Sequence, residues 1–113
     1  MDKQQDEQIE AGKEINVNSR TITLDEPIER SGKDIRKITV RKPGSGELRG
    51  VSLMALAEMD VTTLHRVLPR ITSPILNELE VQKLAPADLM QFGVAVASFL
   101  LKTQSRKEAF QSE

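Results

Sequence analysis

The stretch that decides the fold is residues 76–101, which read LNELEVQKLAPADLMQFGVAVASFLL. It opens with the signature of a helix start. Asn77 is a good N-cap, and Glu80 stands three residues later, where its side chain can reach back to the cap as in a capping box. The spacing predicts a short helix over residues 78–84.

A second helix start follows almost at once. Pro86 suits the first helical position, and Asp88 stands two residues further on, near the positive end of the helix dipole. Ala85 precedes them and offers no oxygen to cap the backbone N–H groups. The pattern predicts a longer helix over residues 86–102.

The apolar residues of this longer helix fall into two stripes when successive residues are placed about 100° apart. The first stripe consists of Leu89, Phe92, Gly93, Val96, Phe99 and Leu100. The second stripe, centred about 110–130° away, consists of Met90, Val94, Ala97 and Leu101. Together they cover more than half the circumference, whereas a surface helix needs an apolar arc of only about 100°. Two interpretations stay open. The helix is buried entirely in its own domain, or one stripe packs in the domain while the other binds a partner.

Two more helix starts occur earlier in the chain. Ser52 and Asp60 are good N-caps, each preceded by an apolar residue and followed by another four positions later. They predict helices near 53–58 and 61–69. Pro69 disfavours helical backbone at the residue before it, so we expect the second of these helices to end or kink there.

The region before these helices has the period of β-strands. Residues 20–24 alternate apolar or β-branched with polar residues, and Asp25-Glu26-Pro27 is expected to stop that strand. Residues 34–42 form a second alternating run, in which the wrong parity of Ile35 indicates a bulge or a late start.

The turn between the two strands is assigned to residues 30–33, Arg-Ser-Gly-Lys. The segment PGSG, residues 43–46, then breaks the chain before Glu47-Leu48-Arg49, which is a candidate for a short third strand. Because two strands alone are marginal in water, their apolar face should lie on the helices.

We therefore predict an α+β fold in which an N-terminal β-hairpin of two or three short strands packs on a bundle of about four short helices. Residues 1–19 are interpreted as a disordered acidic tail, because their apolar residues are sparse and unperiodic. A single domain should span residues 20–102, with the hairpin in 20–49 and the helical part in 51–102. Residues 103–113 are interpreted as a polar C-terminal tail.

Composition limits the function classes. The chain has 113 residues, a formal net charge of −1 and no Cys, Trp or Tyr. These features predict no disulfide, no thiolate metal site and no global field that attracts nucleic acid. The sequence has no apolar run long enough to predict a membrane span, so we expect a cytoplasmic protein. A domain of about 80 residues buries only about 60–65% of its unfolded surface, so we expect a homo-oligomer.

An enzyme is poorly supported. His65 is the only His, and it lies beside the apolar stripe of its helix, so it is interpreted as a surface residue. Asp60, Glu80 and Asp88 occupy cap or dipole positions, which leaves no acid/base pair. There is no phosphate-binding glycine loop, and no cofactor is predicted.

A small nucleic-acid-binding or regulatory protein is the alternative hypothesis. The outer face of the hairpin is basic and carries Lys33, Arg36, Lys37, Arg41, Lys42 and Arg49. No aromatic residue is interleaved for base stacking, and the same charges would also guard a strand edge against aggregation. Arg66 and Arg70 lie near a pair of helices, but Glu78 and Glu80 occupy the second helix, where bases would be read.

Five short motifs follow one another along the chain: KP at 42–43, LRGVSL at 48–53, VLPRITSP at 67–74, EV at 80–81 and APADL at 85–89. In this order they resemble those of the phage tail assembly chaperones, of the E-protein type found in contractile-tailed temperate phages and prophages. The resemblance runs from about Ile22 to Leu101. Ala85 departs from the polar cap expected in the family. The residues that we assign to the structural motifs are Arg49, Gly50, Pro69, Arg70, Pro74, Asn77, Glu80, Pro86 and Asp88.

The resemblance implies a non-catalytic protein that binds the long helical tape measure protein before the tail tube polymerises around it. It also implies work in the host cytoplasm and absence from the mature virion. Such chaperones are usually made in two forms, the longer by a programmed frameshift, and the extension is thought to recruit the tail tube protein. Phe99-Leu100 can be encoded by a run of thymines, the kind of sequence on which a −1 frameshift occurs.

A protein that solubilises a long amphipathic helix needs an apolar groove or helix face of its own. The wide apolar arc of the last helix is the candidate, and flexible Met side chains suit a surface that accepts varied partners. The predicted partner-binding residues are Leu89, Met90, Val94, Ala97, Leu101, Met54 and Met59.

Overall fold

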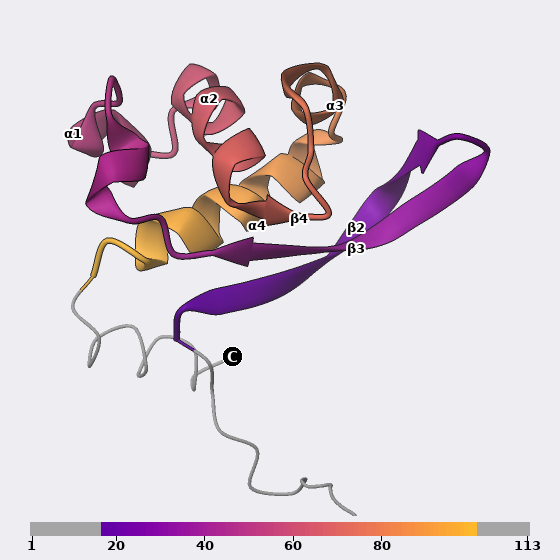
Figure 1. The fold of residues 1–113 in the computed structure, drawn as a ribbon, viewed down its shortest axis with the longest axis horizontal. Helices are drawn as coiled ribbons and strands as arrows, with labels where there is room; N and C mark the ends of the chain where they lie inside the picture. Colours follow the sequence, from indigo (N-terminus) through magenta and orange to yellow (C-terminus); the bar gives the residue numbers. More distant parts are fainter. Residues whose placement is uncertain (1–16, 102–113) are drawn as a thin grey trace, which may run out of the picture.

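A computed structural model describes residues 17–101. The expected C-terminal tail and all but the last three residues of the expected acidic tail lie outside the described residues. The fold is α+β, as predicted: a three-stranded antiparallel sheet followed by a set of helices (Figure 1). In chain order the elements are β2 (Ser19–Arg30), β3 (Lys33–Arg41), the 3₁₀ helix η1 (Ser45–Leu48), α1 (Leu53–Ala57), α2 (Val61–Ile71), β4 (Thr72–Ser73), α3 (Glu78–Gln82) and α4 (Pro86–Ser98).

The hairpin of β2 and β3 turns through two residues. Ser31 and Gly32 both have positive φ, 53° and 78°, as the central residues of a type I′ turn must. The register pairs Ile22 with Ile38 near the open end and Arg30 with Lys33 at the turn. The turn therefore lies where the sequence predicted it.

The first strand is longer than predicted. Asp25-Glu26-Pro27 does not end β2; it forms an irregularity between Thr23 and Ile28, after which pairing resumes. The carboxylate of Asp88, on α4, accepts the backbone N–H groups of Asp25 at 2.7 Å and Glu26 at 3.1 Å. A side chain that lies 63 residues away thus satisfies donors that a regular ladder would otherwise use, and β2 continues.

The third strand is not the one predicted. Residues 47–49 form no strand; Glu47 and Leu48 belong to η1, and β4 pairs with Thr39 and Val40 of β3 instead. The guanidinium of Arg70 donates to the carbonyl oxygen of Glu47 at 2.6 Å. Arg41 donates to the Glu47 carboxylate, at 2.8 Å for Nη1 to Oε1. These bonds hold the segment as a compact turn beside β3.

The helix starts are confirmed by their caps. The Ser52 hydroxyl accepts from the N–H of Ala55 at 3.2 Å, and the Asp60 carboxylate accepts from Thr63 at 3.0 Å. At α3 the capping box is complete: the Asn77 side chain accepts the Glu80 N–H at 2.7 Å, and Glu80 accepts the Asn77 N–H at 3.0 Å. The helix α4 has Pro86 in its first turn and no side-chain cap at Ala85.

The helix ends differ from the prediction. Pro69 lies inside α2, which continues to Ile71. Leu68 and Ile71 are fully or almost fully buried, and the Thr72 hydroxyl donates to the carbonyl of Leu68 at 2.8 Å, so packing and a local bond outweigh the restriction that proline imposes. The shorter helix α3 ends at Gln82, before the predicted 84.

The last helix, α4, ends at Ser98 rather than at residue 102. The Ser98 hydroxyl donates to the carbonyl of Ala95 at 2.6 Å, and the N–H groups of Leu100 and Leu101 bond to carbonyls three residues back. The chain therefore tightens into turns although the apolar residues continue.

The core lies between the sheet and the helices. One face of the hairpin contributes Ile22, Leu24, Ile38 and Val40, all at most 3% exposed. Phe92, Ala95 and Val96 of α4, each 0% exposed, pack in the same core, and α4 is in contact with both β2 and β3. In Figure 1, α1, α2 and α3 lie along one side of α4 and the hairpin lies along the other. The remaining large core residues are Leu56, Leu64, Val67, Leu68, Ile71, Leu76, Val81, Leu84 and Phe99.

An ion pair also joins the hairpin to the helices. Arg30, the last residue of β2, donates through Nε and Nη2 to the two carboxylate oxygens of Glu80, at 3.1 and 2.7 Å. Its Nη2 also donates to the carbonyl of Ile75 at 2.8 Å. The hydrogen bond from Arg30 lowers the pKa of Glu80, which its capping bond to Asn77 lowers further.

No helix within residues 17–101 is long and apolar enough to cross a bilayer.

We expect Asp88→Ala to lower the free energy of unfolding by about 2–4 kcal/mol, because two N–H groups of β2 lose a charged acceptor. Asp88→Asn should cost less, since its amide oxygen can still accept. Urea denaturation followed by circular dichroism measures both, with Asp34→Ala at the exposed hairpin tip as the control. A loss under about 0.5 kcal/mol for Asp88→Ala would show that this carboxylate does not hold the bulge.

We also expect Glu47 to contribute to acid sensitivity. Its pKa is lowered from 4.5 to about 2, chiefly by the hydrogen bond from Arg41 and then by the backbone N–H of Gly44. Because the folded-state pKa is depressed, this stabilisation is present above pH 4.5 and is lost as the pH falls toward 2. The urea midpoint of Glu47→Gln should therefore fall less steeply over that window than the wild-type midpoint. The prediction is contradicted if the urea midpoints of the two proteins change in parallel with pH.

Candidate functional site: an apolar groove beside the last helix

The two stripes of α4 have different surroundings. Phe92, Gly93, Val96 and Phe99 of the first stripe are buried. Leu89 is half-buried, and Leu100, which lies beyond the helix, is exposed. In the second stripe Met90 is 58% exposed and Val94 is 44% exposed. The helix thus packs most of the first stripe into the core of its own domain, and it exposes Met90 and Val94 of the second stripe to solvent.

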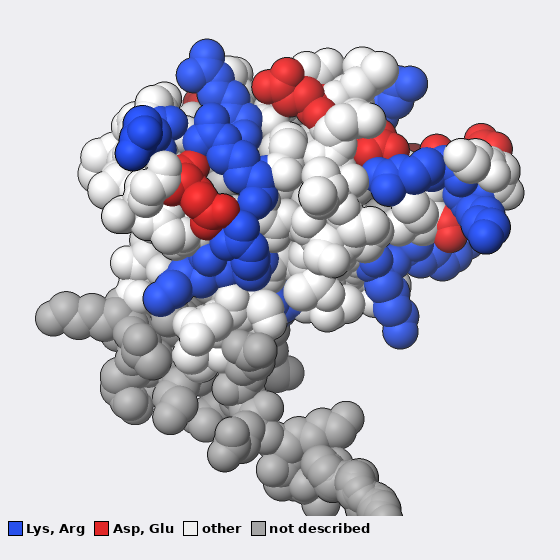
Figure 2. All heavy atoms as spheres, viewed as in Figure 1, with Lys and Arg blue, Asp and Glu red and all other residues white. Residues whose placement is uncertain are grey.

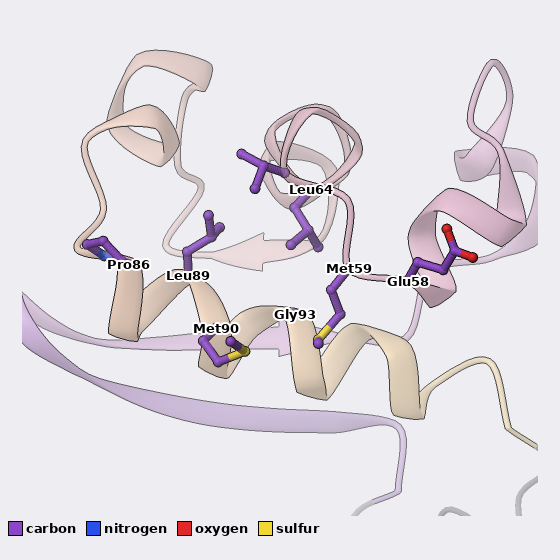
Figure 3. A pocket seen from close by; sticks show the side chains of 8 residues that line it. Glu58, Met59, Leu64, Pro86, Leu89, Met90 and Gly93 are labelled. Carbon is purple, nitrogen blue, oxygen red and sulfur yellow. The ribbon is translucent and has the colours of Figure 1, made fainter.

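A groove of about 350 Å³ runs beside the exposed stripe. We call it the α4 groove. It lies between the first half of α4, the start of α2 and the connection from α1 to α2, and Figure 3 shows its lining side chains. The lining residues are Glu58, Met59, Val61, Leu64, Pro86, Leu89, Met90 and Gly93. All but Glu58 are apolar.

Gly93 makes the close approach at this groove possible. A Cβ atom at this position would lie 3.1 Å from Sδ of Met59 and 3.3 Å from Cδ1 of Leu64. Figure 3 shows the Met59 side chain reaching from the α1–α2 connection to α4 at Gly93. Met59 itself has a φ of 59°, a left-handed conformation that non-glycine residues seldom adopt. The short connection therefore turns sharply and carries a flexible side chain onto the glycine.

The structure places the predicted partner-binding residues in three groups. Met59, Leu89 and Met90 line the α4 groove. Val94 follows one turn beyond Met90 on the exposed side, and Ala97 is half-buried. Leu101 is 47% exposed but lies beyond the end of α4, and Met54 is 69% exposed on α1 but does not line the groove.

Sequence reasoning missed several residues of the groove. Val61 is 51% exposed although it follows the Asp60 cap directly, and Leu64 and Pro86 were assigned only to the helix stripe and the helix start. Glu58 is the only charged residue in the lining, and no Lys or Arg lines the groove. The apolar position of Val61 in the first turn of α2 was the one available signal.

The basic residues are partly engaged in the fold. Figure 2 shows Lys and Arg in separate groups on one face, with Asp and Glu among them. Arg41 is paired with Glu47 and Arg30 with Glu80, and these bonds raise the pKa of both guanidinium groups. The aromatic residues within 17–101, Phe92 and Phe99, are buried, so this part of the chain exposes no ring for stacking on a base.

No cluster of His, Asp and Glu within the described part of the chain is arranged to hold a metal ion. His65 is half-buried on α2. The carboxylate of Asp60 caps α2 by accepting hydrogen bonds from the hydroxyl and the N–H of Thr63, and these bonds lower its pKa. The chemistry that this site offers is apolar contact.

The residues assigned to the structural motifs join segments that are distant in sequence. Arg70 donates to the carbonyl oxygen of Glu47 and, at 3.4 Å, to that of Arg49. It thereby links the segment LRGVSL at 48–53 to the segment VLPRITSP at 67–74. Glu80 and Asp88 link α3 and α4 to β2. Of the remaining motif positions, Gly50 has a φ of 79° and Pro74 follows a cis peptide bond.

These features define a small α+β domain with an exposed apolar groove, and comparison with known families identifies the class. The chain matches the family described as "Phage tail assembly chaperone proteins, E, or 41 or 14" over residues 21–101. It belongs to this family of phage tail assembly chaperones, as the sequence motifs predicted.

Two curated relatives come from Escherichia phage P2. The chain is 47% identical to tail assembly protein E over 79 residues, which cover 70% of this chain and 87% of that protein. It is 46% identical to tail assembly protein E′ over 80 residues, which cover 71% of this chain and 56% of that protein. The match thus spans little more than half the length of E′. No solved structure matches the chain. The family and these relatives support a role in phage tail assembly.

We expect Gly93→Val to destabilise the domain by about 1–3 kcal/mol, because the added atoms must displace Met59 and Leu64. Gly93→Ala should have a smaller effect, since the gain in helix propensity, about 1 kcal/mol, offsets the crowding of a flexible Met side chain. Urea denaturation measures both variants. A Gly93→Val protein as stable as the wild type would show that the contact with Met59 is loose.

Proposed function

We propose that this chain is a non-catalytic chaperone that binds the tape measure protein and keeps it soluble before the tail tube polymerises. The observation that carries the proposal is the exposed second stripe of α4 beside an apolar groove. A tape measure protein is a long amphipathic helical chain that would aggregate if its apolar faces were left uncovered. A rigid helix face with a neighbouring groove is a surface on which such a chain can dock.

The fold supports this use of the surface. Single exposed apolar side chains are common on protein surfaces and need no explanation, whereas a contiguous group of them does. Met90 and Val94 stand together on one helix, beside Met59 and Val61 at the groove. Contiguous exposed apolar residues of this kind mark interaction sites more often than isolated ones do.

The proposal extends to two forms of the protein. The relatives E and E′ match almost the same number of residues of this chain and differ in how much of their own length the match covers. We propose that a domain of this type coats the tape measure protein, and that a longer form made by frameshifting recruits the tail tube protein. The chaperone would act in the host cytoplasm, would be absent from the mature virion and would work as a homo-oligomer.

Nucleic-acid binding through the basic hairpin is the weaker candidate. Part of the positive charge is neutralised within the fold, and both described Phe side chains are buried. Electrostatic binding to phosphates weakens steeply with salt, whereas apolar coating of a helix does not. Retention of the tape measure protein at low and at high salt therefore separates the two functions.

We expect Val94→Asp to abolish co-solubilisation of the tape measure protein on co-expression while the domain remains folded. The exposed valine adds little to stability, but an Asp in its place would bury a charge in the complex. The readout is the fraction of tape measure protein in the soluble extract, with circular dichroism and urea denaturation of the purified variant to confirm folding.

Leu79→Asp is the matched control, because Leu79 is 60% exposed on α3 and does not line the α4 groove. It should leave co-solubilisation unchanged. The proposal is wrong if folded Val94→Asp protein still solubilises the tape measure protein as well as the wild type does.

A further inference from the structure

The exposed face of α4 has the spacing of a helix-packing seam. Met90, Val94 and Ala97 follow one another at intervals of four and three residues, as the core positions of a coiled coil do. Seven residues of helix rise about 10 Å, so the seam is about two turns long. A second helix can lie along it with its own apolar side chains between these residues.

The α4 groove adds a hole at one end of this seam. Met90 belongs to both, and the groove continues from it past Gly93 to Met59 and Leu64. Because Gly93 has no side chain, Met59 packs directly on α4 at this point, and the groove lies beside this contact (Figure 3). A large aliphatic side chain projecting from a helix on the seam would enter the hole as a knob.

The charge at the groove is acidic. Glu58 is exposed and is the only charged residue among those that line it, and Asp60 lies two residues further along the same connection. An occupant with a Lys or Arg about one turn from its knob could place that cation near Glu58. An acidic residue at the same place would be repelled.

We propose that the α4 groove and seam receive one helix of the partner, in which a large aliphatic side chain is followed or preceded, three or four residues away, by a Lys or Arg that meets Glu58. This inference rests on the proposed function and specifies which segments of the tape measure protein the chaperone would choose. The contact surface is short, so a long helix with several such segments could hold several copies.

A second copy of this chain fits the same surface less well. In a symmetric contact through this surface, the second copy would offer its own α4, and residues 86–98 contain no Lys or Arg. Two such faces would bring together seams whose groove lining carries only acidic charge. Charge complementarity therefore favours a different polypeptide over self-association through this face.

The test uses overlapping synthetic peptides of about 28 residues, four heptads, that span the tape measure protein of the phage encoding this chain. Binding of labelled peptides to the full chain is measured by fluorescence anisotropy. We expect the binding peptides to share the knob and the neighbouring Lys or Arg. Glu58→Lys should weaken their binding about threefold to tenfold, and changing the peptide cation to Glu should weaken wild-type binding similarly.

The decisive measurement combines the two changes. Glu58→Lys with the Glu-substituted peptide should restore binding to within about twofold of the wild-type pair, because the ion pair is re-formed with reversed charges. Glu29→Lys makes the same charge change on an exposed position of β2 that does not line the groove, and it should have no such effect.

Other results would separate this inference from the proposed function. Suppose that Val94→Asp abolishes peptide binding, but Glu58→Lys binds the Glu-substituted peptide no better than either single change allows. The role of Glu58 is then wrong and the docking surface stands. If Val94→Asp leaves peptide binding intact, the proposed docking surface is wrong. If wild-type chain self-associates, Val94→Asp makes it monomeric and the peptides do not compete, the occupant is a second copy and this inference is overturned.

Discussion

The orientation of α4 depends on one buried carboxylate. Asp88 is 0% exposed and accepts two backbone N–H groups from the irregular part of β2. Because these bonds fix one side of the helix against the sheet, Phe92 and Val96, one and two turns later, must face the core. Met90 and Val94 then necessarily face away from it. The contacts of Asp88 in the first turn of α4 thus determine which apolar residues of the helix are buried and which are exposed.

Two other polar contacts hold the halves of the domain together. The ion pair of Arg30 with Glu80 joins the turn end of the hairpin to α3, and Arg70 joins α2 to the segment that follows β3. These contacts involve several of the positions by which the chain resembles its family, and they concern architecture. The residues of the exposed seam, Met90, Val94 and Ala97, all lie outside the motifs. The motif positions thus serve the framework of the domain, whereas the exposed seam is not needed to hold it together.

Local signals predicted much of the fold, and long-range contacts account for what they missed. Ser52, Asp60 and Asn77 cap helices within four residues of themselves, so the sequence located those starts. The bond from Asp88 to β2, the pairing of β4 with β3 and the end of α4 at Ser98 depend on partners or turns that no periodicity reveals. For the candidate site, the two stripes and Met59 were predicted, but Val61, Leu64 and Glu58 join the groove only through the packing of α2 on α4.

The glycine at the base of the groove limits which substitutions this surface can accept. Any side chain at Gly93 would press on Met59, whose backbone is already in a left-handed turn. Met90, Val94 and Glu58 are exposed and can be exchanged without disturbing the core. The exposed rim of the groove can therefore accept substitutions that its floor at Gly93 cannot.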